Sequence, residues 1–181
     1  MKKLVAFCGS PRKHGFTRSI MEQVIAGAQS KGLLCIFYDL NEPGIRGCQH
    51  CGYCRTHEGC GIQNDPLSPM YQDIKEACAI LFGSPIYFYQ LSGQSKIWLD
   101  RLYPMFDTPS YKSRYPGKKS VTVFSQGFED TELYQHVIND MNGRFGRWGW
   151  EVMDTFLTAG KEPEPEMLDR AFQTGKLLAE L

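Results

Sequence analysis

The sequence predicts an α/β fold in which a doubly wound sheet of five parallel strands carries helices on both faces. Short apolar runs alternate along the chain with segments whose apolar residues recur at helical spacing, five of each. Parallel neighbouring strands need helical crossovers, and these are right-handed. No internal repeat, low-complexity tract or linker interrupts residues 1–181, which we therefore expect to form a single domain.

Three strands and two helices are expected in the first half of the chain. Residues 4–7 are too few for a helix and too apolar for a surface strand, so they predict a strand buried on both faces. A helix follows from Thr17, because Ile20, Val24 and Ala28 are spaced for one helical face, and Gly32 ends it. The next expected elements are a strand at 33–38, a helix at 68–77 and a strand at 79–82.

In the second half of the chain, proline and glycine mark the expected breaks. Pro85 cannot donate to a central ladder, so residues 84–87 are expected to form a turn. The remaining expected elements are a helix at 92–102, a loop at 103–119, a strand at 121–124, a turn at 125–127, a helix over 133–145, a strand at 148–157 and a helix at 164–181.

The turn after the first strand has the composition of a phosphate cradle. It joins a strand to a helix, which directs the free amides and positive dipole end of that helix at whatever occupies the turn. A dianionic phosphate also needs hydroxyls and cations. The turn and the first helical residues supply Ser10, Arg12, Lys13, Thr17, Arg18 and Ser19.

Three familiar phosphate loops are excluded at this turn. The nucleoside-triphosphate loop has four residues between its glycines, whereas five separate Gly9 from Gly15. Pro11 removes the dinucleotide pattern Gly-x-Gly-x-x-Gly. A cysteine phosphatase would have arginine six residues after Cys8, where His14 stands instead. The remaining alternative is a solvated turn with incidental positive charge.

Three turns are expected to meet where the parallel strands end, at 9–17, 84–92 and 125–130. Ligands of doubly wound sheets bind at this edge. The first turn is cationic, whereas the other two carry aromatic, amide and small residues. A phosphate at one end and a flat, hydrogen-bonding ring at the other is the shape of flavin mononucleotide (FMN). The alternative is that Tyr87 and Tyr89 only cover core.

These motifs resemble those of the NADPH-dependent FMN reductase family of flavodoxin-like proteins. The resemblance extends from Lys3 to about Leu157 and is carried by Gly9-Ser10-Pro11-Arg12-Lys13 with Thr17, Gly83-Ser84-Pro85-Ile86-Tyr87, Ser95-Lys96 and Asp100-Arg101. It implies a flavodoxin-like fold with strand order 2-1-3-4-5, bound FMN, NAD(P)H as co-substrate, and subunits that pair as a homodimer or homotetramer.

The same resemblance implies roles for individual residues. The phosphate would be held by Ser10, Arg12, Thr17, Arg18 and Ser19. The flavin ring would be lined by Pro85, Ile86, Tyr87 and Phe88, with Ser125, Gln126 and Gly127 on its other edge. His14 and Phe16 depart from the family pattern, in which asparagines are usual. No side chain is assigned as a catalytic acid or base, because hydride transfer between stacked rings needs none.

Four of the seven cysteines crowd into one unpatterned stretch, the cysteine-rich loop at 41–66. Connections of this length usually have a function. Cys48, Cys51, Cys54 and Cys60 can bring four thiolates to one metal centre. Their spacing resembles the compact cysteine motif of the iron-sulfur flavoproteins, a branch of the same family, and implies a [4Fe-4S] cluster beside FMN.

Other interpretations of this loop stay open. Zinc can take the four cysteines, or three of them with His50 or His57. The thiols can also remain free, form a disulfide, or act as a redox-sensitive set near Arg55. Cys35 and Cys78 are expected to pack in or beside strands rather than bind metal.

Charge and composition exclude several classes of partner. Twenty basic residues balance twenty acidic ones, which indicates neither nucleic acid nor an anionic membrane as partner. The first residues predict neither a signal peptide nor a spanning helix, so a cytoplasmic location is expected. Lys112, Arg114, Lys118 and Lys119 are expected to be solvated, the alternative being contact with the 2′-phosphate of NADPH.

Two functions follow from these patterns. The first is an NAD(P)H-dependent oxidoreductase with FMN that reduces a free flavin, a quinone or another small acceptor. The second is an iron-sulfur flavoprotein that carries electrons between redox proteins. A third class, a phosphate-binding module without flavin, predicts a colourless protein.

Overall fold

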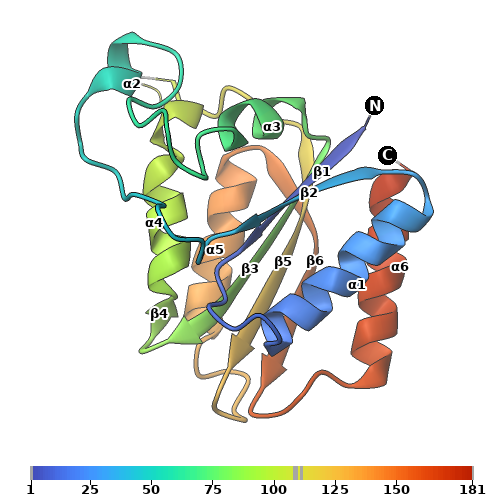
Figure 1. Cartoon of the computed structure of the whole chain (residues 1–181). Coiled ribbons are helices and arrows are strands. Elements are labelled where there is room, and N and C mark those ends of the chain that lie inside the picture. Colours follow the sequence, from blue (N-terminus) through green and yellow to red (C-terminus); the bar gives the residue numbers. More distant parts are fainter. Residues whose placement is uncertain (1, 108–109, 111, 181) are drawn as a thin grey trace.

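The computed structural model describes residues 2–107, 110 and 112–180 of the chain. A twisted sheet lies between two layers of helices (Figure 1). The strands are β1 (Lys3–Cys8), β2 (Leu34–Asp39), β3 (Ala79–Tyr87), β4 (Gln90–Leu91), β5 (Lys118–Gln126) and β6 (Trp150–Ala159). The helices are α1 (Phe16–Ser30), α2 (Tyr53–Thr56), α3 (Met70–Glu76), α4 (Gly93–Arg101), α5 (Gln135–Arg147) and α6 (Pro165–Ala179), with a 3₁₀ turn, η1 (Tyr103–Met105).

The order of the parallel strands confirms the predicted fold class. The strands run β2-β1-β3-β5-β6 and every pair in this series is parallel, which is the expected order 2-1-3-4-5 once β4 is set aside. β4 is a two-residue strand that pairs antiparallel with the end of β3 and was not predicted. The end of the predicted last helix, Leu181, lies outside the described residues.

Burial on both sides of the sheet explains why the strands are almost continuously apolar. In β1, Val5 and Phe7 belong to the core under α3, α4 and α5, while Leu4 and Ala6 belong to the core under α1 and α6. Successive strand residues point to opposite faces, so a central strand needs apolar residues at every position.

The expected turn at 84–87 is wrong, because β3 continues through Pro85 to Tyr87. Pro85 pairs with Ser125 of β5, but the pairing of β3 with β1 ends at Gly83. Beyond Gly83 one edge of β3 is therefore no longer bound to β1, and a residue without an N–H is tolerated there. β5 also extends further than expected, so Ser125 and Gln126 end a strand rather than form a turn.

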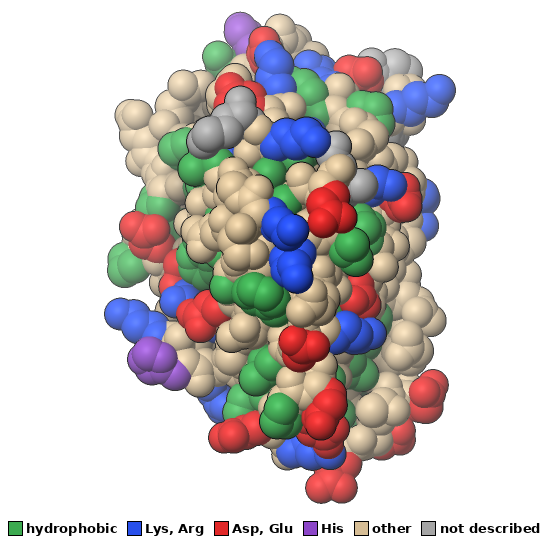
Figure 2. Space-filling model, turned by 90° about the vertical axis from the view of Figure 1, so that its right-hand side faces the viewer, with side chains coloured by type: hydrophobic (Ala, Val, Ile, Leu, Met, Phe, Trp, Pro, Cys, Tyr) green, Lys and Arg blue, Asp and Glu red, His purple; other side chains and the backbone are tan. Residues whose placement is uncertain are grey.

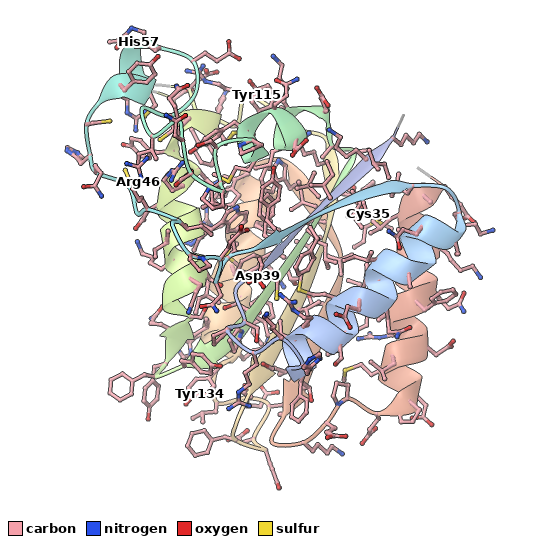
Figure 3. The ribbon with its side chains drawn as sticks, viewed as in Figure 1. Cys35, Asp39, Arg46, His57, Tyr115 and Tyr134 are labelled. Carbon is pink, nitrogen blue, oxygen red and sulfur yellow. The ribbon has the colours of Figure 1, made fainter. Side chains whose placement is uncertain are left out.

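The strands and α4 together define two ends of the molecule. The carboxyl ends of β3, β5 and β6 lie at the bottom of Figure 1, and α4 returns from there to the top, where α2 and the cysteine-rich loop lie. Tyr134 marks the lower region in Figure 3 and Asp39 lies near the middle, whereas Arg46, His57 and Tyr115 mark the upper region.

Surface charge is mixed on the face that Figure 2 turns to the viewer, where acidic and basic side chains are interspersed. Within the described ranges, no helix has the length and apolar character needed to cross a bilayer.

Candidate functional site

A hollow of about 150 Å³ opens where β1, β3 and β5 end, and all three predicted turns contribute to it. The first turn lines it with Ser10, Arg12 and Gly15, the second with Pro85 and Tyr87, and the third with Ser125, Gln126 and Gly127. The strand order places these turns together although they are far apart in the sequence. The three predicted turns therefore meet around one hollow, as expected.

The first turn presents an uncapped helix end to the hollow. α1 begins after Gly15, no side chain caps its N-terminus, and its first turn has no acidic residue. The Ser10 hydroxyl accepts a hydrogen bond from the backbone N–H of Arg12 at 3.3 Å, which shapes the turn. Free helix amides beside an exposed arginine suit a phosphate group.

Three predicted phosphate-binding residues are engaged elsewhere. Thr17 Oγ1 lies 2.8 Å from Ser125 Oγ, the Arg18 guanidinium pairs with Asp39 of β2, and Ser19 donates to the Phe16 carbonyl at 2.9 Å. None of these three side chains is among the residues that line the hollow in the described part of the chain. Thr17 and Ser125 instead join the start of α1 to the end of β5.

The second turn is a two-residue hairpin with two aromatic residues at its tip. Tyr87 pairs with Gln90, and Phe88 and Tyr89 between them have φ angles of 47° and 67°. Two positive φ angles at the centre of such a hairpin define a type I′ turn, which normally uses Asn and Gly. Phe88 is 94% exposed, whereas Tyr89 contacts the ring of Tyr134, with centroids 5.4 Å apart. Ile86, predicted to line the flavin, is a core residue.

Gln126 lines the hollow and has one unpaired side-chain acceptor. Its side-chain amide donates to the carbonyls of Phe128, at 3.0 Å, and Asp130, at 2.7 Å. Its Oε1 is buried and has no hydrogen-bond partner among the described residues. A buried acceptor without a donor is unfavourable unless a ligand supplies one. The uncapped helix and this acceptor match the two polar ends of FMN, so the residues present fit that cofactor.

Three buried serines, Ser84, Ser92 and Ser95, support the first turn from behind. Sequence analysis placed Ser84 and Ser95 in motifs but gave none of the three a role. Ser92 Oγ donates to the Gly9 carbonyl at 2.8 Å, and Ser95 Oγ donates to Ser84 Oγ at 2.8 Å. Ser92 also caps α4 by accepting from the backbone N–H of Ser95. A serine before a helical pattern signals a cap, but the contact with Gly9 depends on tertiary structure.

A second hollow, of about 160 Å³, lies at the opposite end of the molecule and is lined by all four loop cysteines together with Arg101. Cys48, Cys51, Cys54 and Cys60 are free thiols, and Cys60 Sγ accepts a hydrogen bond from the Ile62 N–H at 3.4 Å. Within the described residues, no three His, Cys, Asp or Glu side chains form a ready metal site. The four thiols thus surround one space without converging on a point, and as a donor set they fit a thiophilic metal.

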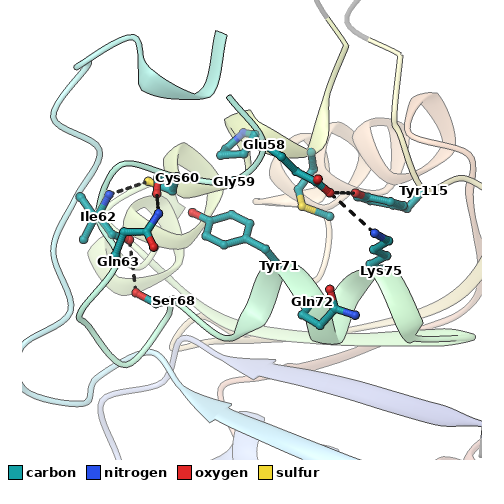
Figure 4. Close-up of a pocket in the computed structure, with 12 residues that line it drawn as sticks. Glu58, Gly59, Cys60, Ile62, Gln63, Ser68, Tyr71, Gln72, Lys75 and Tyr115 are labelled. Carbon is teal, nitrogen blue, oxygen red and sulfur yellow. Dashed lines mark hydrogen bonds and ion pairs between the residues drawn. The ribbon is translucent and has the colours of Figure 1, made fainter. Parts of the chain in front are cut away.

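Beside it lies a larger hollow of about 360 Å³, shown in Figure 4. Cys60 lines both spaces. Glu58 Oε1 lies 3.7 Å from Lys75 Nζ and 3.5 Å from the Tyr115 hydroxyl, so these groups are only loosely held. Burial raises the pKa of Tyr71, which stays a neutral phenol at the back of this space.

The predicted solvation of the cations at 112–119 is wrong for Lys118. This residue begins β5, is buried, and donates to the Ala77 carbonyl at 2.7 Å, while burial lowers its pKa. Arg114 pairs with Asp107 and Lys119 with Glu151. Lys118 and Lys119 begin β5, and the first hollow lies at the other end of that strand. The alternative prediction, that these two lysines contact the 2′-phosphate of NADPH at the hollow, is therefore also wrong.

Comparisons with known proteins agree with this geometry. The family model described as NADPH-dependent FMN reductase matches residues 2–130. An iron-sulfur flavoprotein of Archaeoglobus fulgidus is 26% identical over 181 residues, which cover 98% of this chain and 79% of that protein. An iron-sulfur flavoprotein of Methanocaldococcus jannaschii is 27% identical over 133 residues, 74% of this chain and 68% of that protein.

Solved structures show the same fold at low sequence identity. A NAD(P)H:quinone oxidoreductase from Methanothermobacter marburgensis has a TM-score of 0.72 at 19% identity and covers 98% of this chain and 96% of its own. A flavodoxin from the domain Archaea has a TM-score of 0.60 at 17% identity, covering 99% and 97%. The architecture is therefore flavodoxin-like.

Proposed function

The chain belongs to the NADPH-dependent FMN reductase family, and from that premise we propose that it holds FMN in the hollow where β1, β3 and β5 end. It is a flavoprotein oxidoreductase that uses FMN with NAD(P)H. The observation that carries the proposed location is the meeting of all three predicted turns around one space.

Each turn has a proposed task. Arg12, Ser10 and the free amides at the start of α1 bind the phosphate. Pro85 and Tyr87 bound the ring, and Gln126 Oε1 accepts from a ring N–H. FMN, when bound, supplies the hydride chemistry, so the protein contributes position and electrostatics.

The phosphate assignment is tested by titrating the apoprotein with FMN and with riboflavin, which lacks the phosphate. Arg12→Ala should weaken FMN binding about tenfold, equivalent to about 1.4 kcal/mol, because a charge-assisted hydrogen bond is lost. Riboflavin binding should not change. Equal weakening of both ligands, or of neither, would contradict the assignment. Arg144→Ala, on α5 and away from the hollow, is the control.

The reductase activity is tested by mixing the FMN-loaded protein with NADPH or NADH in a stopped-flow instrument. Rapid bleaching of the flavin absorbance is expected for an enzyme that oxidises a nicotinamide. Inertness toward both nucleotides, together with reduction by a ferredoxin, would instead favour an electron carrier.

We also propose that the electron acceptor is a small molecule such as a flavin or quinone. We propose in addition that the protein forms a homodimer or homotetramer and is cytoplasmic.

A second proposed function is electron transfer through a thiolate-bound [4Fe-4S] centre, supported by the four cysteines that line one hollow. Protein purified without oxygen should then contain iron and sulfide and be brown rather than yellow. An anaerobic preparation without iron would contradict a cluster, and stoichiometric zinc would replace it by a structural zinc site.

A further inference from the structure

We propose that Arg101 is the positioning residue that holds the cysteine loop in shape for its metal centre. Arg101 is the last residue of α4. The part of the cysteine-rich loop from Arg46 to Asp65, which contains all four loop cysteines, is called the cysteine loop. This inference rests on the proposed metal site and assigns a role to a residue outside its four thiols.

One guanidinium ties both ends of the cysteine loop together. Arg101 Nη1 donates to the Arg46 carbonyl at 2.8 Å, at the start of the loop. Its Nη2 donates to the Ile62 carbonyl at 3.4 Å, near the end. All four loop cysteines lie between Arg46 and Ile62 in the sequence. Arg101 therefore holds together the two ends of the segment that would surround a metal.

The carboxylate of Asp65 also bonds Arg101 and the start of the cysteine loop; Arg101 and Asp65 together are called the clamp. The carboxylate receives two hydrogen bonds from Arg101, at 2.5 and 3.2 Å, and one from the Arg46 N–H at 3.2 Å. Both side chains of the pair are 0% exposed. Ser68 Oγ donates to Asp65 at 2.9 Å and contacts the Ile62 carbonyl at 3.2 Å. The base of the loop is therefore held by a buried network rather than by a surface pair.

The contacts require the planar fork of arginine. Arg101 Nε uses the remaining donor on the Tyr71 hydroxyl at 3.2 Å, and that hydroxyl donates to the Arg101 carbonyl at 2.8 Å. A lysine would keep the charge, but its single ammonium cannot reach two carbonyls, a carboxylate and a phenol at once. Arg101 also lines the cysteine hollow, which brings its positive charge beside a centre made of anionic thiolates.

The test uses cobalt(II) as the probe, added without oxygen to reduced, FMN-loaded protein. Thiolate-to-cobalt absorption reports binding at the cysteines. Arg101→Lys should lower cobalt affinity about 10- to 100-fold, the usual effect of removing a partner that orients metal ligands. FMN affinity should be unchanged, because α4 begins near the flavin hollow but Arg101 lies at its other end.

A double variant removes the risk that a lone buried charge unfolds the protein. Arg101→Met with Asp65→Leu deletes both charges of the pair, and it should lose cobalt affinity as much as Arg101→Lys. The matched control is Arg144→Met with Asp140→Leu, which removes a half-exposed pair on α5 and should bind cobalt like the wild type.

A metal-free readout separates the clamp from the metal site. Trypsin should cut after Arg46 and Arg55 several-fold faster in the Arg101 variants, because the loop base is released. Wild-type protein without thiolate-to-cobalt bands would overturn the proposed metal site and this inference together. Wild-type binding that Arg101→Lys leaves intact, or trypsin rates that do not change, would overturn the role of Arg101 alone.

Discussion

At the scale of single residues, Gly9 shows how packing behind the turn limits the sequence. A Cβ at this position would lie 1.9 Å from Ser95 Oγ and 2.9 Å from Ser92 Oγ, two buried hydroxyls whose oxygens lie 3.0 Å apart. The turn approaches α4 so closely that only a residue without a side chain fits.

Replacing Gly9 with Ala should therefore destabilise the protein. We expect the free energy of unfolding to fall by about 1–3 kcal/mol, the usual cost of overpacking a core. Urea denaturation measures the change. Gly146→Ala is the matched control, since nothing lies within 4 Å of its Cβ position and it sits inside α5. That variant should be stabilised by up to about 1 kcal/mol, and an equal loss in both would contradict the packing argument.

The cysteines divide by their surroundings. Cys48 and Cys51 are exposed, whereas Cys8 is buried. Burial, with a smaller contribution from Cys78, raises the pKa of Cys35 to about 11. The expectation that Cys35 packs beside the core agrees with its place against the α1 and α6 core.

Alkylation should follow this division. With iodoacetamide at about pH 8 and no metal, Cys48 and Cys51 should react first, because only the thiolate reacts and both are accessible. Cys35 should react roughly 100-fold more slowly than an ordinary thiol of pKa 8.5. Peptide mass spectrometry over time measures the order. Equal rates for Cys35 and Cys51 would contradict the half-buried position of Cys35.

At the scale of elements, the β3–β4 hairpin is the strained part of the proposed flavin site. Within the described residues, only His50, Phe88 and Tyr89 combine a side chain with positive φ. Two of these three form one turn, and strain of this kind is concentrated at functional sites. The sequence did not predict the hairpin, since neither Phe nor Tyr signals a type I′ turn.

Phe88→Asn should separate stability from flavin binding. Asn tolerates the left-handed region and the ring it replaces is almost fully exposed, so the free energy of unfolding should rise by about 0.5–1 kcal/mol. FMN binding should weaken, because we propose that Phe88 covers the flavin ring. Thermal unfolding and FMN titration measure both effects. Phe128→Asn, an exposed phenylalanine without positive φ, should not be stabilised.

At the scale of the whole molecule, the sheet order was predictable and the side-chain networks were not. Alternation of apolar runs with helical patterns is a local signal, and handedness rules then leave few topologies. Arg18 and Arg101 show the limit: both are cations in recognisable motifs, but their partners Asp39 and Asp65 are 21 and 36 residues away in the sequence. The position of the hollow followed from topology, whereas the contacts of Thr17 with Ser125 and of Arg18 with Asp39 could not be predicted from the sequence.

The first and last helices, α1 and α6, pack backbone against backbone. A Cβ on Gly27 of α1 would lie 1.9 Å from the Phe172 carbonyl oxygen, and one on Gly175 of α6 would lie 2.0 Å from the Val24 carbonyl oxygen. The two backbones thus touch directly, and a side chain at either glycine would clash with the backbone of the other helix.

Gly175→Leu should force α6 away from α1. We expect a loss of about 3 kcal/mol or more in the free energy of unfolding, because backbone atoms cannot move aside as a flexible side chain can. Leu177→Ala, at a position that is 51% exposed on the same helix, should change stability by less than about 0.5 kcal/mol. Chemical denaturation compares them, and similar effects of the two would contradict the close contact.

The separation of the two hollows has a consequence for how the protein ages in air. The four loop cysteines line the hollow at one end of the molecule, where Cys48 and Cys51 are exposed to oxidants. None of the four lines the hollow proposed for FMN at the other end. For protein that carries the proposed [4Fe-4S] cluster, oxygen should damage the end with the loop cysteines and spare the flavin hollow, so an aged sample should fade from brown to yellow rather than to colourless.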